Sequence, residues 1–510
     1  MNKQELLRSI TFGKRIAEEE TAELNTYFVE TDQWQRIFAG EVDVVYGAKG
    51  AGKSAMYSLL QNRADALFDR GVLIIAAENP RGAPIFKDLV ADPPATEDEF
   101  RNLWKLYFLS LVGKLLRDYE IGGDPAQKVI DALEEAQLLQ KENTLPAILR
   151  SVIDYVRSVI RAESIEGGLK LDPTTGLIVG ATGKITLREP SSAQRQAGLI
   201  SADTLFNLVN VALADSNFRI WVALDRLDVA FADSETLEGN ALRALFRVYL
   251  DFLAYDRLSL KIFLRSDIWR RVTAGGFREA SHITRHITIA WDKDTLLNLI
   301  IRRALRNDSL RAFYNVSEVL VLQDAQLQKQ LFARVFPAQV NVGPNKPSTF
   351  DWMISRTRDG LGANAPREMI HLLISARDGQ LKRLEMGNAE PPDETLFERI
   401  TLREALSPIS NVRLNQTLYA EYPNLMPYLQ KLEGAKTQQT PETLGTIWGI
   451  DPAEALKVAS SLRDVGFFER RDSDEKPVFW VPFLYREALR MVQGAATSEP
   501  DDTQQSDFDD

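Results

Sequence analysis

The stretch that decides the fold is Asp43-Val44-Val45-Tyr46-Gly47-Ala48-Lys49-Gly50-Ala51-Gly52-Lys53-Ser54. Its β-branched start, from Val42 to Tyr46, predicts a short buried strand, and the apolar residues from Ala55 onward follow a helical period. The glycine-rich turn between them fits the pattern G-x-x-x-x-G-K-S of a P-loop. A strand, a glycine-rich turn and a helix in this order predict the first unit of a parallel α/β sheet.

The turn after this strand has the chemistry of a phosphate-binding site. Its glycines allow positive φ angles and let backbone N–H groups approach an anion closely. The helix that begins at about Lys53 directs the positive end of its dipole at the same place. The Lys53 ammonium can reach the β- and γ-phosphates of a nucleotide, and the Ser54 hydroxyl can bind Mg²⁺. We therefore predict that ATP is bound by Gly47, Ala48, Lys49, Gly50, Ala51, Gly52, Lys53, Ser54 and Ala55.

The composition is that of a soluble globular protein in a reducing compartment. The 510 residues should form roughly three domains at about 150 residues each. The chain has no cysteine, which excludes disulfides, thiolate metal sites and a cysteine nucleophile. No apolar run approaches the roughly 18 residues of a membrane span, and the N-terminus lacks an apolar leader, so we expect a cytoplasmic protein without a membrane segment. The net charge of −11 argues against non-specific coating of nucleic acid.

Four further apolar runs, at 71–77, 219–225, 258–267 and 283–289, predict the other strands of a doubly wound parallel sheet. The strand at 219–225, the third of the sheet in sequence order, ends in Asp225. An apolar strand that ends in aspartate is the Walker B pattern, in which the carboxylate holds Mg²⁺. The alternative is an aspartate that caps a helix. The fourth strand ends in polar residues that include Arg265, and we expect its end beside Asp225, where an arginine can sense the γ-phosphate. Guanine specificity is not expected, because no Asn/Thr-Lys-x-Asp sequence follows a strand.

The remaining segments predict the domain organisation. Residues 1–40 form an N-terminal helical segment, and residues 41–292 form the P-loop core, which carries an insertion of helices and a β-hairpin at 97–188. Residues 293–386 predict a helical lid. In the lid Pro366 opens a helix, so that Arg367 in its first turn either faces a nucleotide or forms a surface salt bridge. Residues 394–494 predict a winged helix, and the acidic tail at 495–510 should be disordered.

Together these motifs resemble the AAA+ and STAND groups of P-loop ATPases, which include the origin-recognition ATPases. Four stretches are similar to a family of poorly characterised bacterial P-loop ATPases: Tyr46 to Ala55, Leu224 to Asp228, Leu264 to Trp269 and Val481 to Arg486. The resemblance implies an oligomerising switch, and by analogy some relatives take part in defence against phage.

One position departs from the AAA+ pattern. Typical members have a catalytic glutamate directly after the Mg²⁺-binding aspartate, but Arg226 stands there in this chain. Asp228 can orient the attacking water if the chain turns at the strand end. If it cannot, hydrolysis is slow and the protein is a nucleotide-gated switch. Four arginines lie at element ends, namely Arg226, Arg265, Arg285 and Arg367. We predict that hydrolysis needs an arginine that a neighbouring subunit supplies in trans. The alternative is that Arg367 acts in cis.

Two functions therefore remain open. The first is an oligomerising ATPase switch that uses ATP and Mg²⁺ and acts on a protein partner. The second is an origin-recognition-like ATPase that binds DNA through its winged helix. The acidic composition favours the first, because lysine and arginine contacts to phosphate supply most non-specific DNA affinity. A small basic group keeps the second open, and its members are Arg463, Arg470, Arg471 and Lys476.

Overall fold

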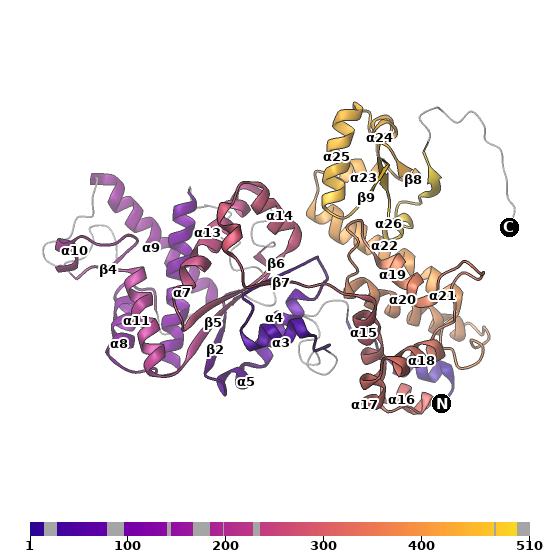
Figure 1. Ribbon diagram of the computed structural model, residues 1–510, viewed down its shortest axis with the longest axis horizontal. Coiled ribbons are helices and arrows are strands. Elements are labelled where there is room, and N and C mark those ends of the chain that lie inside the picture. Colours follow the sequence, from indigo (N-terminus) through magenta and orange to yellow (C-terminus); the bar gives the residue numbers. More distant parts are fainter. Residues whose placement is uncertain are drawn as a thin grey trace. The chain divides into compact units, whose positions relative to one another are not determined.

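The computed structural model describes residues 1–14, 28–78, 96–139, 144–166, 184–196, 198–227, 235–473 and 476–496 (Figure 1). The chain divides into two compact units. The first, here called the sheet unit, comprises Glu30–Gly47 and Lys53–Ile289. The second, the helical unit, comprises Met1–Val29, Ala48–Gly52 and Ala290–Asp510. The segment 1–40, expected as one N-terminal piece, is thus divided between the two units.

A five-stranded parallel sheet organises the sheet unit. Its strands are β1 (Val44–Gly47), β2 (Val72–Ala76), β5 (Arg219–Leu224), β6 (Leu258–Arg265) and β7 (His286–Thr288), in the order β2-β5-β6-β1-β7. Every pair in this sheet is parallel. The predicted parallel α/β sheet is confirmed, and β6 pairs with β5 as expected. β7 is shorter than the apolar run at 283–289.

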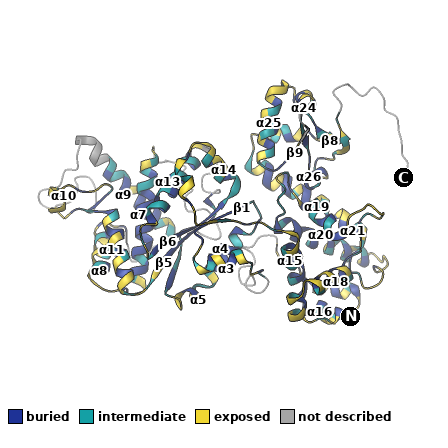
Figure 2. Cartoon of the chain, viewed as in Figure 1, coloured by how far each residue is buried: buried dark blue, intermediate teal, exposed yellow. Residues whose placement is uncertain are grey.

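Ten helices of the described chain belong to the sheet unit, and one of them is buried on all sides. Most side chains of α7 from Phe100 to Leu116 are buried (Figure 2), because α7 packs against α13, α9, α8 and α11. A helix that is apolar all round is stable only in such a place. The helices are α3 (Asp32–Ala39), α4 (Lys53–Asn62), α5 (Ala64–Phe68), α7 (Glu97–Asp118), α8 (Asp124–Glu135), α9 (Leu145–Glu166), α10 (Ser192–Gln196), α11 (Ala202–Asp215), α13 (Glu235–Phe252) and α14 (Ser266–Ala274).

The insertion predicted at 97–188 is helical in its first part, as α7, α8 and α9 show. Most of the predicted hairpin, at 167–183, lies outside the described residues. The short strand β3 (Ile185–Thr186) pairs in parallel with β4 (Ile200–Ser201). The described end of this segment therefore joins a later strand rather than an antiparallel neighbour.

The helical unit has one continuous hydrophobic core that joins the expected lid to the C-terminal segment. The first helix, α1 (Lys3–Ser9), packs on α20 and α16, and the Lys3 ammonium donates to the carbonyl oxygens of Pro391 and Asp393, each at 2.6 Å. α20 begins at Pro366, as predicted. The lid helices are α15 (Lys293–Leu305), α16 (Asp308–Tyr314), α17 (Glu318–Gln323), α18 (Ala325–Val335), α19 (Thr349–Thr357) and α20 (Pro366–Glu385).

The C-terminal part of this unit is a winged helix, as predicted. The helices α24 (Pro441–Trp448) and α25 (Pro452–Asp464) precede an antiparallel wing of β9 (Glu469–Ser473) and β10 (Lys476–Trp480). The wing is part of a four-stranded sheet with the order β11-β8-β10-β9. The remaining elements are α21 (Arg399–Glu404), α22 (Leu406–Arg413), the π-helical turn η4 (Leu414–Tyr419), α23 (Met426–Gln430), β8 (Lys436–Gln439), α26 (Phe483–Arg486) and β11 (Val492–Ala495).

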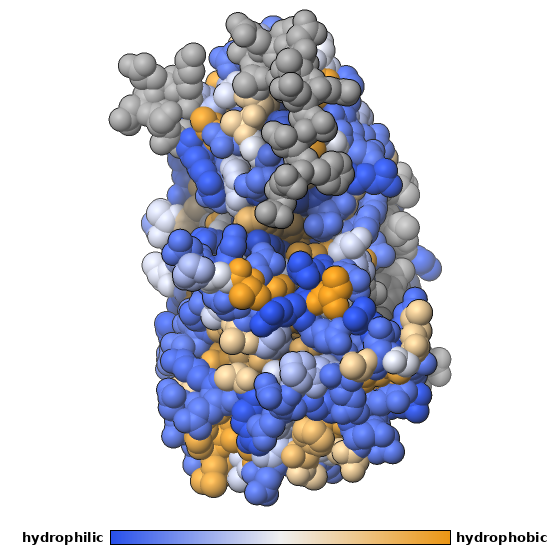
Figure 3. All heavy atoms as spheres, turned by 90° about the vertical axis from the view of Figure 1, so that its right-hand side faces the viewer, coloured by the Kyte–Doolittle hydropathy of each residue, from blue (hydrophilic) through white to orange (hydrophobic). Residues whose placement is uncertain are grey.

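The surface and the C-terminus complete the description. Hydrophilic side chains cover most of the face in Figure 3, and hydrophobic ones form separate groups. Among the described residues, no helix combines the length and the apolar character needed to cross a bilayer. The expected acidic tail lies outside the described residues from Thr497 onward, while Ala495 ends β11.

Candidate functional site at the carboxyl edge of the sheet

The turn after β1 has the backbone of a phosphate-binding loop. Gly50 and Gly52 have φ angles of 81° and 102°, which side chains other than glycine rarely adopt. The Ala51 N–H donates to the Ala48 carbonyl oxygen at 3.1 Å, which closes the turn. α4 then begins at Lys53, with Ser54 and Ala55 in its first turn. The predicted stretch from Gly47 to Ala55 is therefore a strand end, a left-handed loop and a helix start in direct succession.

Lys53 lies against this loop. Its residue is 9% exposed, and its ammonium donates to the Gly47 carbonyl oxygen at 3.0 Å. The side chain thus spans the turn from the first residue of the helix back to the last residue of the strand. Such a placement holds a positive charge over backbone N–H groups that also favour an anion.

Asp225 follows the last residue of β5 and is 4% exposed. Arg226, directly after it, has a φ angle of 59°. This left-handed conformation is uncommon for a residue with a side chain, and it turns the chain sharply at the strand end. Such a turn is the condition under which Asp228 can orient the attacking water. Asp228 itself lies outside the described residues.

A second strand-end carboxylate, Glu78, was missed by the sequence analysis. Ala76 of β2 is level with Ala223 of β5, and the Ala77 N–H donates to the Ala223 carbonyl oxygen at 2.8 Å. Glu78 stands two residues after Ala76, as Asp225 stands two residues after Ala223, so the two carboxylates follow neighbouring strands at the same level. Glu78 is 1% exposed. The signal was present in the sequence, because the apolar run of β2 also ends in an acid.

The contacts of Tyr57 place α4 beside these two carboxylates. The Tyr57 hydroxyl donates to the Glu78 carbonyl oxygen at 2.8 Å. Burial raises the pKa of Tyr57, and the charges of Asp225 and Glu78 raise it further. Tyr107 of α7 donates to the Ala77 carbonyl oxygen at 2.8 Å, and burial, with the charge of Glu78, also raises its pKa. Two tyrosines therefore fix the backbone on either side of the Ala77–Glu78 bond.

Arg265 ends β6, opposite Gly47 in the register of the sheet. Its guanidinium forms two contacts with Asp267, from Nε to Oδ1 at 3.1 Å and from Nη2 to Oδ2 at 2.8 Å. The side chain is 11% exposed. The arginine is thus at the predicted edge of the sheet and is held by a carboxylate of its own chain.

Arg367 lies in the first turn of α20, beside the tip of the P-loop. A Cβ atom on Gly50 would be 3.0 Å from the Cβ atom of Arg367, and both residues belong to the helical unit. Within the part of the chain that the structure describes, Arg367 has no ion-pair partner. The assignment of Arg367 to the nucleotide site stays a prediction.

Arg285 does not lie at this edge. It precedes β7, and its guanidinium contacts Asp43, which precedes β1, at 3.1 Å. Because the strands are parallel, residues before β1 and β7 lie at the amino edge of the sheet, opposite the P-loop. The expectation that Arg285 surrounds the nucleotide site is therefore wrong.

Other contacts hold the loop tip, Ala48–Gly52, in the helical unit. Lys49 forms an ion pair with Glu421, and the indole N–H of Trp291 donates to the Ala51 carbonyl oxygen at 2.8 Å. These two contacts tie the loop to the start of the lid and to the segment after η4.

Behind the loop tip lies a chain of buried charged groups. A carboxylate oxygen of Glu368 would be 3.4 Å from a Cβ atom on Gly50. Glu368 in turn accepts a hydrogen bond from Arg413 at 3.1 Å, and Arg413 donates to the Tyr485 hydroxyl at 3.4 Å. Burial raises the pKa of Asp359, the second carboxylate near Arg413, and the charge of Arg413 opposes that shift. Hydrogen bonds of Arg413 thus join α20 to α26, and Glu368 at one end of this chain lies close to Gly50 of the P-loop.

Comparisons with known proteins leave the family open. No protein-family model matches the chain, and no curated protein matches it. Among solved structures, the chain is similar to the Aeropyrum pernix ORC1 protein in complex with DNA, with 12% identity over 93% of this chain and 96% of that chain and a TM-score of 0.36. It is also similar to the Aeropyrum pernix ORC2 protein in its ADPNP–ADP complexes, with 13% identity, coverage of 93% and 91% and a TM-score of 0.28. At such scores these similarities carry no argument about function.

Proposed function

We propose that this protein is an AAA+-like ATPase that works as a nucleotide-dependent switch. It binds ATP with Mg²⁺, hydrolyses it slowly, and passes the state of its nucleotide site to a protein partner. The observation that carries the proposal is the surroundings of the loop tip, Ala48–Gly52. Lys49 pairs with Glu421, Trp291 donates to Ala51, and Gly50 lies beside the first turn of α20, all within the helical unit.

The loop residues fit a nucleoside triphosphate. The left-handed Gly50 and Gly52 keep side chains away from the turn, so that backbone N–H groups can face phosphate oxygens. In the complex Lys53 exchanges its bond to the Gly47 carbonyl oxygen for the β- and γ-phosphates. Ser54 and Asp225 would hold Mg²⁺. When bound, the ion neutralises charge that develops on the phosphoryl oxygens.

The carboxylates decide how fast such a site hydrolyses ATP. Arg226 cannot act as a base, because an arginine stays protonated in proteins. Glu78 is buried at the level of Asp225, and its backbone is fixed by Tyr57, so we assign to Glu78 the task of orienting the attacking water. Asp228 is the alternative. Slow turnover follows, because the carboxylate stands on a neighbouring strand instead of directly after Asp225.

The contacts of the loop tip carry the switch. An anion on the loop N–H groups competes with the present environment of Lys49 and Gly50, which are held by Glu421 and by the first turn of α20. Any adjustment of Glu368 reaches Arg413, because a buried charge that loses its partner costs several kcal/mol, of the order of 3–5. The π-helical turn η4 lies directly between Arg413 and the segment of Glu421, and such turns are frequent at functional sites.

A protein partner fits the winged helix better than DNA does. Two residues of its basic group are compensated: Arg463 pairs with Asp464 at 2.7 Å, and Arg471 pairs with Glu469 at 2.9 Å. Arg471 also lies over the Trp480 ring at 4.1 Å. The two carboxylates place negative charge beside these arginines, which weakens their attraction for phosphate, on which DNA affinity depends. We therefore propose that the partner is a protein. We also propose that the protein is a homo-oligomer in the cytoplasm. A role in defence against phage rests only on the resemblance to the bacterial P-loop ATPase family.

Hydrogen–deuterium exchange with and without ATP–Mg²⁺ tests the proposal. In the wild type, ATP should change exchange in peptides that contain Arg413 and Glu421, and Lys53→Ala should abolish this change. Lys128→Ala, on the exposed face of α8, is the matched control and should behave as the wild type does. ATP binding without any change in these peptides would contradict the switch, and an absence of ATP binding would contradict the nucleotide site itself.

A further inference from the structure

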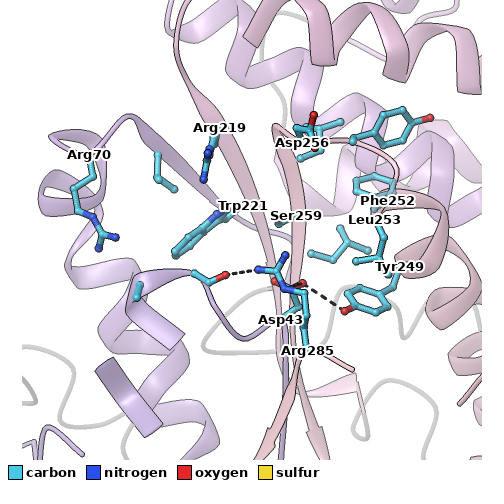
Figure 4. A pocket seen from close by; sticks show the side chains of 16 residues that line it. Asp43, Arg70, Arg219, Trp221, Tyr249, Phe252, Leu253, Asp256, Ser259 and Arg285 are labelled. Atoms are coloured by element: carbon cyan, nitrogen blue, oxygen red, sulfur yellow. Dashed lines mark hydrogen bonds and ion pairs between the residues drawn. The ribbon is translucent and has the colours of Figure 1, made fainter. Parts of the chain in front are cut away.

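A pocket of about 250 Å³ opens at the amino edge of the sheet, opposite the P-loop (Figure 4). Its lining includes the first residues of three strands, Val72 of β2, Arg219 of β5 and Leu258 of β6. Asp43 and Arg285, which precede β1 and β7, complete this edge. The pocket lies within the sheet unit and shares no residue with the proposed nucleotide site.

A buried charge cluster lies beside this pocket, and its Asp43, Tyr249 and Arg285 belong to the lining. The Lys261 ammonium, with 2% of its side chain exposed, donates to Asp43 Oδ1 at 2.8 Å and to the Val42 carbonyl oxygen at 2.7 Å. Arg285 contacts Asp43 Oδ2 at 3.1 Å, and the Tyr249 hydroxyl donates to the same oxygen at 3.4 Å. Burial lowers the pKa of Lys261. Two cations thus share one carboxylate in a poorly solvated place, which is costly for stability.

The walls of the pocket add two more cations. Arg70 donates to the Phe38 carbonyl oxygen at 2.9 Å, and Arg219 begins β5. Neither arginine has a carboxylate partner among the described residues. In Figure 4 Arg219 lies above the Trp221 ring, and the Arg285 guanidinium lies to the right of that ring. Two arginines that line the same opening attract an anion.

Charge and size narrow the class of ligand. Three arginines of the lining, Arg70, Arg219 and Arg285, stand against two carboxylates, Asp43 and Asp256. The formal excess of one positive charge favours an anion, and the acceptor oxygens of a phosphoryl group suit the fork of an arginine. The volume is below the roughly 300–1,000 Å³ of pockets for drug-sized ligands, so a nucleoside triphosphate is too large.

We propose that this pocket binds a small organic phosphate, with its phosphoryl group between Arg219 and Arg285 and an apolar or aromatic body against Trp221 and Leu253. Arginine suits this task, because its planar fork can hold a phosphoryl group with two parallel hydrogen bonds. Leu253 is one of the large apolar residues of this unit that stay exposed, and a ligand body would cover it. The site is independent of the proposed ATPase function.

Calorimetric titration with phenyl phosphate tests this assignment. The full-length protein should carry Lys53→Ala, so that the P-loop does not contribute binding. We expect one saturable site, and Arg219→Ala should weaken it roughly tenfold or more, since hydrogen bonds to charged groups are strong. Arg219→Lys, which keeps the charge, should lose less. Arg195→Ala on the exposed helix α10 is the matched control and should leave the affinity unchanged. Arg219 is exposed, so an unchanged melting temperature is expected for its variants.

Two further probes separate the parts of the proposal. Inorganic phosphate should bind more weakly than phenyl phosphate, because it lacks the ring, and benzoate should bind more weakly still, because it has only one charge. Absence of saturable binding, or equal affinity in Arg219→Ala and Arg195→Ala, would overturn the site. Equal affinities of inorganic and phenyl phosphate would overturn the apolar contact with Trp221 and Leu253.

Discussion

Lys53 is the residue on which nucleotide binding depends most directly. Its ammonium is one of the few charges in contact with the P-loop backbone, at 3.0 Å from the Gly47 carbonyl oxygen. Lys53→Ala should abolish measurable ATP binding by calorimetry, because the positive charge opposite the β- and γ-phosphates is lost. The fold should persist, since one lost hydrogen bond of this type costs about 0.5–1.5 kcal/mol. Wild-type affinity in the variant would refute the site, and circular dichroism verifies the fold.

Glu78 is the carboxylate through which hydrolysis can be tested. Glu78→Gln keeps the size of the side chain and should leave ATP affinity nearly unchanged, while turnover falls by about 10²–10⁴, the usual contribution of a positioned acid–base group. Retained ATP affinity together with lost turnover separates this role from a merely structural one. Asp225→Asn is the comparison, because it should lower the response to Mg²⁺ instead. If Glu78→Gln hydrolyses ATP normally, Asp228→Asn becomes the decisive variant.

At the scale of elements, the N-terminus of α15 offers a test of how the helical unit is held together. Asp292 caps this helix through the Thr295 N–H at 2.8 Å. Hydrogen bonds from the Thr295 backbone and from its hydroxyl hold the pKa of Asp292 below its ordinary value. A lowered pKa in the folded state means that the stabilisation is complete above the unfolded value and is lost as the pH falls through the folded one.

Asp292→Ala should therefore reduce the free energy of unfolding by about 1 kcal/mol at pH 7. The difference from the wild type should shrink at pH 3, because the unfolded carboxyl is largely protonated below its ordinary value of about 3.9 and part of the stabilisation is lost there. Chemical unfolding at the two pH values measures this. Asp294→Ala removes an exposed acid from the same turn that makes no capping bond, and it should cost less. A difference that does not change with pH would show that the carboxylate form is not what stabilises α15.

The elements also show what could be predicted from the sequence. The strands of the main sheet were found because a parallel strand, buried on both faces, is a continuous apolar run. Pro366 marked the start of α20, because proline suits the first turn of a helix. Glu78 was missed because the run was ended at Ala77, one residue too early. Arg285 was misplaced because an arginine at the beginning of a strand and one at its end belong to opposite edges of a parallel sheet. The contact of α1 with α20 joins distant segments, which no local pattern encodes.

At the scale of the whole molecule, the arginines decide whether hydrolysis needs a neighbour. Arg265 is held by Asp267, and Arg285 lies at the other edge of the sheet. An arginine supplied in trans is worth about 10³–10⁵ in rate, and this chain has no glutamate directly after Asp225. We predict that specific ATPase activity rises steeply when the protein concentration is raised over about a hundredfold range, because assembly of subunits depends on concentration by mass action. A constant specific activity over that range would assign the work to Arg367 in cis.

The division of the P-loop between two units has a mechanical consequence. The chain passes between the units at 29/30, 47/48, 52/53 and 289/290, and two of these crossings enclose only the five residues Ala48–Gly52. So short a segment has few conformations of its own, and inside the helical unit it is held by Trp291 and by Glu421. A ligand that binds the segment closes its local openings. At about 100 times its Kd such a ligand contributes about 2.7 kcal/mol, enough to lower the population of the open segment about a hundredfold.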